Sequence, residues 1–226
     1  MQLGRRIGAK LTYKYYDAYG FFNKTGISLS GEPRSGGIFY KLDDIKPIEL
    51  AIMSFGQRFT ITPLQMITAA SAIANGGTLL QPQIVDKITN TDTGEVTSFD
   101  KKEVCQVISK ETADKVTSMM ESVVTTGTGQ HGAVAGYSIG GKTGTSEPRN
   151  GTSDGYVASF IAISPVENTK VVLLVILKNP TGKQHNGGQI AAPTASKMLS
   201  EILPYLGVES GNKKDTNTNI SSDDLY

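Results

Sequence analysis

Residues Lys142-Thr143-Gly144-Thr145 form a tetrapeptide whose side chains suit acyl-transfer chemistry. A serine enzyme of that kind needs a nucleophilic hydroxyl, a nearby basic group, and backbone N–H donors where the oxyanion forms. Lys142 can supply a positive charge and join a proton network, and both threonines can offer hydroxyls to a substrate carboxylate. Gly144 leaves bare backbone against which a substrate can lie. The tetrapeptide therefore predicts part of an acyl-transfer site, and the alternative is a surface lysine beside a glycine turn.

Three strands are expected around this tetrapeptide. Residues 137–147 contain it, and two apolar runs follow at 156–163 and 170–178. Short apolar runs that are bounded by turn residues are typical of buried strands. Such a sheet needs a cover, and the last long segment of the chain has an amphipathic helical pattern that can provide one. Its apolar residues recur at steps of three and four: Ala195, Met198, Leu199, Ile202, Leu203 and Leu206.

Two further helices have recognisable end signals. Thr62 and Gln65 can form a capping box with Pro63 at the first helical position, and a glycine pair at 76–77 ends the helix. A second helix is predicted between Ser109 and Gly127, because its apolar residues follow the helical period. Both are interpreted as structural elements.

The first part of the chain predicts a helix, a connection and a hairpin. Residues 3–22 suggest one helix with an aromatic face that packs into the core, since apolar spacing is first a packing signal. Residues 23–50 are rich in glycine and proline and predict a long irregular connection. Residues 82–107 predict a hairpin around a turn at 93–94. The expected fold is α/β (α+β): antiparallel sheet strands with a packed C-terminal helix, beside a helical subdomain at 1–130.

The tetrapeptide and its flanks resemble the transpeptidase domain of class B penicillin-binding proteins. The resemblance covers roughly residues 1–207 and is specific, because several unlike segments occur in the order of the family. The segments that carry it are Phe59-Thr-Ile-Thr-Pro-Leu-Gln-Met66, Ala70-Ser-Ala-Ile-Ala-Asn-Gly-Gly77, Gly127-Thr-Gly129, the strand segments at 137–145, 156–163 and 171–177, and Gly187-Gly-Gln-Ile-Ala-Ala-Pro193. It implies the fold that this family shares with serine β-lactamases. The segments at 59–77 and 187–193 favour the biosynthetic family over a β-lactamase.

The resemblance implies a D,D-transpeptidase that crosslinks peptidoglycan at the D-Ala-D-Ala end of stem peptides through an acyl-enzyme. Lys142 would lie near the catalytic serines, and Thr143 and Thr145 would hold the substrate carboxylate beside Gly144. The N–H of Thr145 would be half of the oxyanion hole. Stem peptides and β-lactams are the implied ligands, and other cell-wall synthesis proteins are possible partners of the parent. The implied location is the extracytoplasmic face of the bacterial cell membrane.

Two family motifs with the catalytic serines, Ser-x-x-Lys and Ser-x-Asn, have no plausible counterpart here. Ser98-Phe-Asp-Lys101 lies in a polar turn region and Ser210-Gly-Asn-Lys213 lies in a polar tail, so we interpret both as coincidences. The chain is therefore expected to be a C-terminal half-domain at 1–207, inactive alone, with a disordered tail at 208–226. A catalytically silent binding or scaffold piece is the alternative.

Ser138 is a rival nucleophile. Gly136-Tyr-Ser138-Ile-Gly140 fits the nucleophile elbow of α/β-hydrolases, and Asp154 and His185 follow in the chain order of that fold. An elbow needs a strand that runs into a helix at the serine, whereas glycines and threonines follow here. The run at 127–132 fits a dinucleotide pattern, but it follows a predicted helix instead of a strand, so no nucleotide cofactor is expected.

Composition excludes several other classes of function. The 22 basic and 21 acidic residues leave a net charge of +1, so no basic patch indicates a nucleic-acid partner. Cys105 is the single cysteine, and His131 and His185 lack metal-ligand spacing, so neither a disulfide nor a metal is expected. No apolar run reaches the roughly 18 residues of a membrane span, and the start has no signal-peptide pattern. No membrane contact is expected from this segment.

Overall fold

The computed structural model describes residues 1–33, 39–148 and 155–211. At its centre is a three-stranded antiparallel sheet in the order β5-β6-β7. β5 spans Gly140–Ser146, β6 spans Val157–Ser164 and β7 spans Val171–Lys178. The three strands predicted around the tetrapeptide are therefore confirmed. Of the predicted tail, residues 212–226 lie outside the described residues, and so does Asp154.

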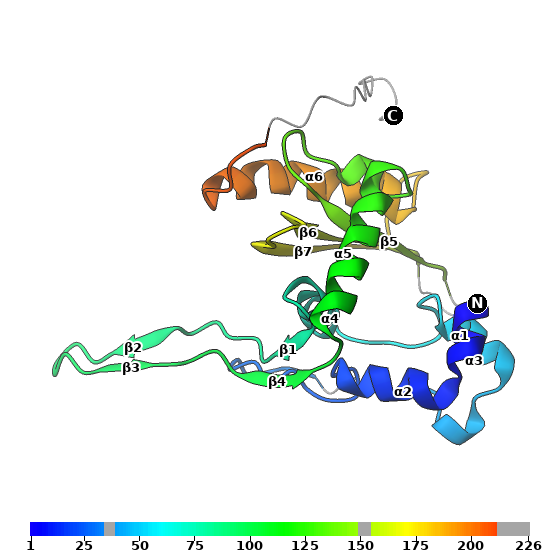
Figure 1. Ribbon diagram of the computed structural model, residues 1–226, viewed down its shortest axis with the longest axis horizontal. Coiled ribbons are helices and arrows are strands. Elements are labelled where there is room, and N and C mark those ends of the chain that lie inside the picture. Colours follow the sequence, from blue (N-terminus) through cyan, green and yellow to red (C-terminus); the bar gives the residue numbers. More distant parts are fainter. Residues whose placement is uncertain (34–38, 149–154, 212–226) are drawn as a thin grey trace.

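Helix α6 (Gly187–Tyr205) covers one face of this sheet, as predicted (Figure 1). Its inner face is fully buried and combines three alanines with two leucines: Ala191, Ala192, Ala195, Leu199 and Leu203. They pack against Phe160, Ala162 and Val175 of the sheet. Met198 and Leu206, which the apolar pattern placed on the same face, are 42% and 49% exposed. The buried face of α6 therefore contains fewer of the large apolar residues than predicted, and three of its five residues are alanines.

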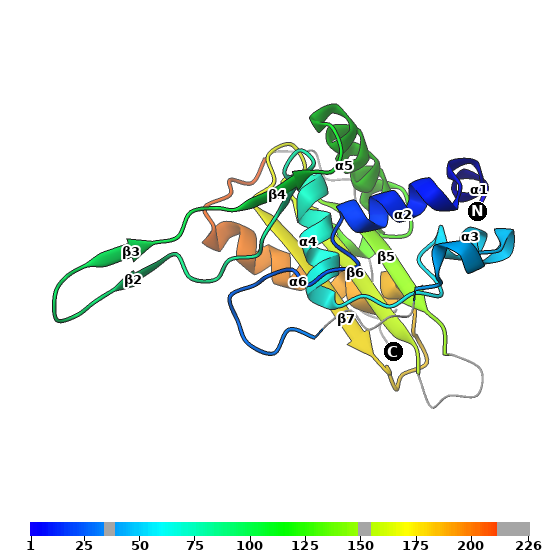
Figure 2. The ribbon, with the colours of Figure 1, turned by 90° about the horizontal axis from the view of Figure 1, so that it is seen from below.

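Helix α4 (Pro63–Ala74) lies against the other face of the sheet, next to β6 and β7 (Figures 1 and 2). Its predicted capping box is confirmed. The N–H of Gln65 donates to Thr62 Oγ1 at 3.1 Å, and the N–H of Thr62 donates to Gln65 Oε1 at 2.9 Å. The buried Gln65 amide also donates to the carbonyls of Gly20, Phe21 and Asn23, which ties the segment after α2 to this helix.

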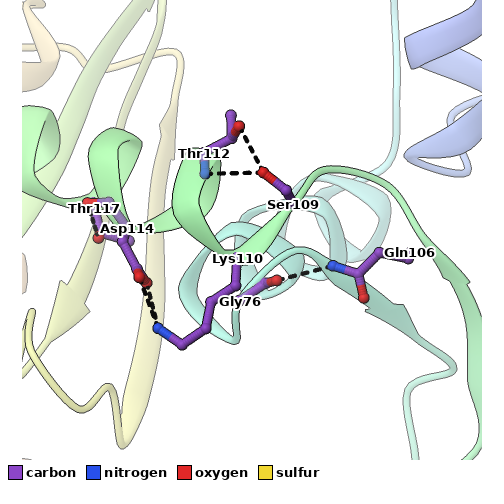
Figure 3. A network of polar contacts seen from close by, with 7 residues as sticks. All are labelled: Gly76, Gln106, Ser109, Lys110, Thr112, Asp114 and Thr117. Atoms are coloured by element: carbon purple, nitrogen blue, oxygen red, sulfur yellow. Dashed lines mark hydrogen bonds and ion pairs between the residues drawn. The ribbon is translucent and has the colours of Figure 1, made fainter.

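Helix α5 (Lys110–Thr125) runs beside β5 and confirms the second predicted helix. Figure 3 shows its start, where Ser109 Oγ accepts from the N–H of Thr112 at 3.2 Å. Lys110 and Asp114 form an ion pair at 2.7 Å one turn apart, and Gln106 donates to the carbonyl of Gly76 at 2.9 Å. The far end of α5 leads into Gly127 and Thr128, followed by the short helix η2 (Gln130–Gly132).

The N-terminal segment forms two helices, α1 (Gln2–Ile7) and α2 (Ala9–Ala18). The prediction of one helix over 3–22 is therefore wrong, because Gly8 adopts a φ of 78° and breaks the helix. The aromatic packing is confirmed around Tyr16, whose ring lies 5.4 to 5.9 Å from those of Phe21, Phe39 and Phe59. Tyr15 and Phe22 of the same predicted face remain exposed.

Residues 23–50 are less irregular than predicted. They contain the short helix η1 (Leu42–Asp44) and the beginning of α3 (Pro47–Met53). Proline at the first helical position suits α3, because its ring already holds the helical φ and its missing N–H is not needed there. The buried residues of α3 are Leu50, Ala51 and Met53.

A β-hairpin forms an arm that extends away from the rest of the molecule (Figures 1 and 2). Its strands, β2 (Lys87–Thr89) and β3 (Val96–Ser98), are exposed along their whole length and confirm the predicted hairpin. At its base, β1 (Thr78–Leu80) pairs with β4 (Glu103–Gln106), a pairing that the sequence did not predict. The helical subdomain expected at 1–130 thus contains the predicted hairpin and, in addition, the β1–β4 pair.

Candidate active site

Two side-chain donors show which edge of β5 is open. Gln57 Nε2 donates to the carbonyl of Thr145 at 3.1 Å, and Lys142 Nζ donates to the carbonyl of Thr143 at 2.7 Å. Both carbonyls therefore lie on the edge of β5 that faces away from β6. Since the N–H and C=O of one strand residue point to the same side, the N–H of Thr145 lies on this open edge as well.

The hydroxyls of the two threonines are held by the elements on either side of β5. Thr143 Oγ1 lies 3.0 Å from the hydroxyl oxygen of Thr128, which follows α5. Thr145 Oγ1 accepts a hydrogen bond from the N–H of Gly187 at 3.1 Å. That N–H belongs to the first turn of α6, whose donors have no partner within the helix. One threonine is thus fixed by the end of α5 and the other by the start of α6.

A pocket of about 440 Å³ lies where these elements meet. Its lining is polar and largely uncharged, with hydroxyl, amide and imidazole groups: Thr128, Gln130, His131, Thr143, Thr145, Asn186 and Gln189, together with Gly127 and Gly188. Such groups can donate to the oxygens of a carboxylate or a peptide. Lys142 is exposed beside the pocket and does not line it.

Glycines allow α6 to start directly against the strands. A Cβ atom on Gly187 would lie closer than 3.0 Å to the carbonyl oxygens of Gly144 and Ser159, and one on Gly188 would lie 2.5 Å from that of Thr128. Real Cβ atoms essentially never approach so closely. Helix α6 can therefore present its first N–H groups to the pocket only because its first two residues have no side chain.

A second, smaller pocket of about 120 Å³ lies between the end of α2 and the β1–β4 pair. Asp17, Gln65 and Cys105 are among the residues that line it. The amide of Gln65 already donates to three backbone carbonyls. This pocket lies away from β5 and shares no lining residue with the pocket at the tetrapeptide.

Ser138 is not placed as a hydrolase nucleophile. It precedes strand β5 and no helix follows it, so the strand-to-helix elbow is absent. Its carbonyl accepts from Ser164 at the end of β6, whereas His185 stacks on Tyr156 at the start of the same strand. Tyr156 and Ser164 are eight residues apart, so the strand separates Ser138 from His185 by roughly 26 Å, at about 3.3 Å per residue. The hydrolase interpretation is therefore wrong, because Ser138 is not on a strand-to-helix turn and His185 is too far away to activate it.

Of the remaining candidates from the sequence, His131 and the run at 127–132 reach the pocket, and the others lie apart from it. Ser98 ends β3 on the exposed arm, and the Ser210 match extends into residues outside the described part of the chain. His131 lines the pocket and His185 stacks on Tyr156 at a ring distance of 3.9 Å. Within residues 1–33, 39–148 and 155–211, no helix is both long and apolar enough to cross a membrane. The run at 127–132 follows α5 and so lacks the strand that a dinucleotide site requires.

Comparison with known proteins assigns the family. The penicillin-binding protein transpeptidase domain matches residues 1–200 of this chain. The chain therefore belongs to the penicillin-binding protein transpeptidase family. This confirms the resemblance that the tetrapeptide and its flanking segments indicated, and it accounts for the mixed helices and antiparallel sheet.

The relatives of this transpeptidase chain are longer than the chain itself. It is 38% identical over 216 residues to Stage V sporulation protein D of Bacillus subtilis, covering 92% of this chain and 33% of that protein. It is 31% identical over 215 residues to the probable peptidoglycan D,D-transpeptidase PenA of Neisseria gonorrhoeae, covering 92% of this chain and 34% of that protein. The chain thus spans about a third of the length of these curated relatives.

Solved structures show the same fold. Penicillin-binding protein 3 of Mycobacterium tuberculosis, complexed with ampicillin, superposes with a TM-score of 0.83 at 28% identity, over 94% of this chain and 49% of that one. The transpeptidase domain of penicillin-binding protein 3 of Burkholderia pseudomallei, without ligand, gives 0.80 at 28% identity, over 94% of this chain and 62% of that one. The partial coverage of both fits a truncated transpeptidase domain.

The structure brings the predicted tetrapeptide together with residues that sequence reasoning did not select. Gln57 reaches Thr145 from the segment between α3 and α4, and Thr128 reaches Thr143 from the end of α5. The sequence contained a partial signal for Thr128, which lies within the Gly127-Thr-Gly129 match. It contained no local signal for Gln57, because a contact across 88 residues depends on the tertiary fold.

Proposed function

We propose that this chain forms the substrate-holding part of a peptidoglycan D,D-transpeptidase. The parent enzyme acts on the D-Ala-D-Ala end of stem peptides and passes through an acyl-enzyme. In this proposal Thr143 and Thr145 bind the substrate carboxylate, and Gly144 lies against the substrate backbone. Lys142 supplies positive charge beside the catalytic serines, which lie in the part of the domain that precedes this chain in the relatives.

One observation carries the proposal: β5 presents the tetrapeptide on an open edge beside a polar pocket. The N–H of Thr145 lies on that edge, where it can donate to an oxyanion. The hydroxyls of Thr143 and Thr145 line the pocket, and the start of α6 adds the positive end of a helix dipole. Donors of this kind suit a substrate that carries a terminal carboxylate and develops negative charge at a carbonyl.

The ligands and location of the parent follow from the same proposal. β-Lactams bind at this edge, by analogy with the complexes of penicillin-binding protein 3 of Mycobacterium tuberculosis with ampicillin and aztreonam. The parent works at the extracytoplasmic face of the bacterial cell membrane, where peptidoglycan is crosslinked, and meets other cell-wall synthesis proteins there.

A labelled penicillin tests the proposal with two proteins. The first is this chain alone. The second, called the extended chain, is this chain preceded by the matching upstream transpeptidase segment of Stage V sporulation protein D of Bacillus subtilis. Intact-mass analysis should find no penicilloyl adduct on the chain alone, because covalent catalysis is abolished without a nucleophile. It should find one adduct per extended chain.

Each arm has an opposing result. An adduct on the chain alone would contradict the assignment of the catalytic serines to a preceding segment and require a nucleophile within these residues. A folded extended chain that is not acylated would favour the alternative of a catalytically silent binding piece.

Replacing Lys142 by alanine in the extended chain should slow acylation without unfolding the protein, since this side chain is exposed.

A further inference from the structure

Gln57 is a polar side chain with a direct contact to the tetrapeptide strand. It lies in the segment that joins α3 to α4 and is half-buried. Its Nε2 donates to the carbonyl of Thr145 at 3.1 Å. Among the described residues, Gln57 is the side chain from outside β5 that hydrogen-bonds a backbone carbonyl on its open edge. The other side-chain donor on that edge is Lys142, which belongs to β5 and is exposed.

The backbone around Gln57 is held in an uncommon conformation. Gly56 and Arg58, on either side of it, have φ angles of 88° and 66°. A positive φ is uncommon for a residue with a side chain and persists where the surroundings determine it. Arg58 Nη1 donates to the hydroxyl of Tyr40 at 3.3 Å, and the carbonyl of Tyr40 accepts from Tyr13 on α2. These bonds connect the segment that carries Gln57 to the N-terminal helices.

The contact acts on the open edge of β5. β5 pairs with β6 from Gly140 to Ser146, whereas the backbone groups of Thr145 that point away from β6 have no strand partner among the described strands. A hydrogen bond to the carbonyl of Thr145 restricts rotation about that residue. It thereby also restricts its N–H, which lies on the same edge.

We propose that Gln57 is a positioning residue that holds the carbonyl of Thr145, and through it the backbone of this residue, so that the N–H of Thr145 points at the developing oxyanion. The inference rests on the proposed transpeptidase function and adds a residue to it. Gln57 acts through Thr145 and does not touch the reacting atoms. An oxyanion donor stabilises the transition state more than the bound ground state, so misplacing it slows acylation and leaves the preceding binding step unchanged.

Gln57→Glu in the extended chain is the test. The carboxylate keeps the length of the side chain but cannot donate to a carbonyl, whereas the protonated acid can. At neutral pH the acylation rate constant for penicillin should fall by about tenfold, which is what the loss of one hydrogen bond allows. The dissociation constant of the initial complex should not change. The difference in acylation rate constant between the parent and the variant should become smaller as the pH falls towards about 4 to 5, where the carboxyl group becomes protonated.

Two further measurements complete the design. Gln83→Glu is the matched control, because Gln83 also donates to backbone carbonyls, at 3.0 Å to Val85 and 2.7 Å to Phe99, but on the exposed arm. It should be acylated at the rate of the parent. In protein with carbonyl-labelled threonine, the carbon resonance of Thr145 should shift in the Gln57→Glu variant and stay in place in Gln83→Glu. The signal is assigned by its loss in Thr145→Ser.

The outcomes separate this inference from the proposed function. If the parent is acylated and Gln57→Glu matches its rate at neutral pH, the positioning role is wrong and the transpeptidase function stands. If the variant loses binding and acylation together, with no recovery at low pH, Gln57 is only structural and the inference is again wrong. If a folded parent is not acylated, the proposed function fails and this inference fails with it.

Discussion

At Ser138, the hydroxyl donates to Glu167 and accepts from the N–H of Val166 at 3.1 Å. Both partners belong to the segment that follows β6, so the side chain connects the residues just before β5 to the residues just after β6. A hydroxyl committed in this way is part of the local structure. Thr143 and Thr145, by contrast, are half-buried and line the pocket.

We predict that Ser138→Ala destabilises the chain without changing any ester hydrolysis. The N–H of Val166 loses its acceptor, which should lower the free energy of unfolding of the extended chain by about 1 to 3 kcal/mol in urea titrations. Ser118→Ala on the exposed side of α5 is the control and should not destabilise. If the chain hydrolyses an ester and Ser138→Ala eliminates that activity, the hydrolase interpretation has to be restored.

Tyr16 links stability to alkaline pH. Burial, followed by the nearby Tyr13, raises the pKa of Tyr16 to about 12 from its ordinary value of 10.0. The folded state therefore favours the neutral phenol, whose hydroxyl donates to the carbonyl of Met53 at 3.2 Å. A raised pKa contributes stability that is fully present below pH 10.0 and is lost as the pH rises through about 12.

We predict that Tyr16→Phe flattens the pH dependence of stability in this range. The parent should lose stability more steeply than the variant between about pH 10 and pH 12, because the variant has one half-buried phenol fewer to ionise. Tyr13 and Tyr19, whose pKa values are also raised by burial, remain in both proteins, so the slope flattens without vanishing. Unfolding free energies on both sides of the range give the two slopes. Tyr205→Phe is the control, since Tyr205 is 89% exposed, and it should keep the slope of the parent. Equal slopes for all three proteins would contradict the assignment to Tyr16.

At the scale of elements, the site depends on how closely α6 approaches β5. The N–H of Gly187 reaches the hydroxyl of Thr145, and the Gly187 Cα faces the backbone of β5 and β6. We predict that Gly187→Ala forces the start of α6 away from the strands and lowers the melting temperature. It should also slow penicillin acylation of the extended chain.

Gly182→Ala is the matched control for this substitution. A Cβ at Gly182 meets no atom within 4 Å, so the variant should melt and react like the parent. If Gly187→Ala behaves like Gly182→Ala, α6 can shift without cost and close packing at this point is not required for the site.

Local sequence signals predicted most of these elements because each signal has a local physical cause. The capping box at Thr62 and Gln65 forms from residues three apart, and the strands β6 and β7 follow from apolar runs bounded by turns. The prediction failed where one residue changed the backbone, as at Gly8, or where a short helix followed a proline, as in α3.

The tetrapeptide could be predicted, but its setting could not. Lys142 to Thr145 stand together in the sequence, so their chemistry is visible there. Gln57 and Thr128 are distant from the tetrapeptide in sequence and contact it only in the folded chain. Gly187 is required because a side chain at this position would collide with the strands. The apolar pattern of α6 also predicted burial of Met198 wrongly. The pattern does not show that the buried face of this helix is formed largely by alanines, beside which Met198 is exposed.

At the scale of the whole molecule, strand β7 forms the second edge of the sheet. Among the described strands it pairs only with β6, although residues 171–177 are seven apolar residues in succession. On α6, Leu199 is fully buried, whereas Met198 and Leu206 are 42% and 49% exposed. On β7, Ile176 is 39% exposed, so this edge strand combines open apolar surface with unpaired backbone groups.

We predict that the chain alone self-associates and that the extended chain does not. An unpaired apolar edge strand is a template for pairing with another copy, and we expect the upstream segment of the extended chain to cover the open edge of β7. Size-exclusion profiles and thermal melts should therefore show aggregates and a broad transition for the chain alone, and a monomer with a cooperative melt for the extended chain. Ile176→Lys in the chain alone should reduce self-association, since a charge on an edge strand opposes pairing. A monodisperse chain that melts cooperatively without the upstream segment would show that the β7 edge is harmless, and the association expected from it would have to be abandoned.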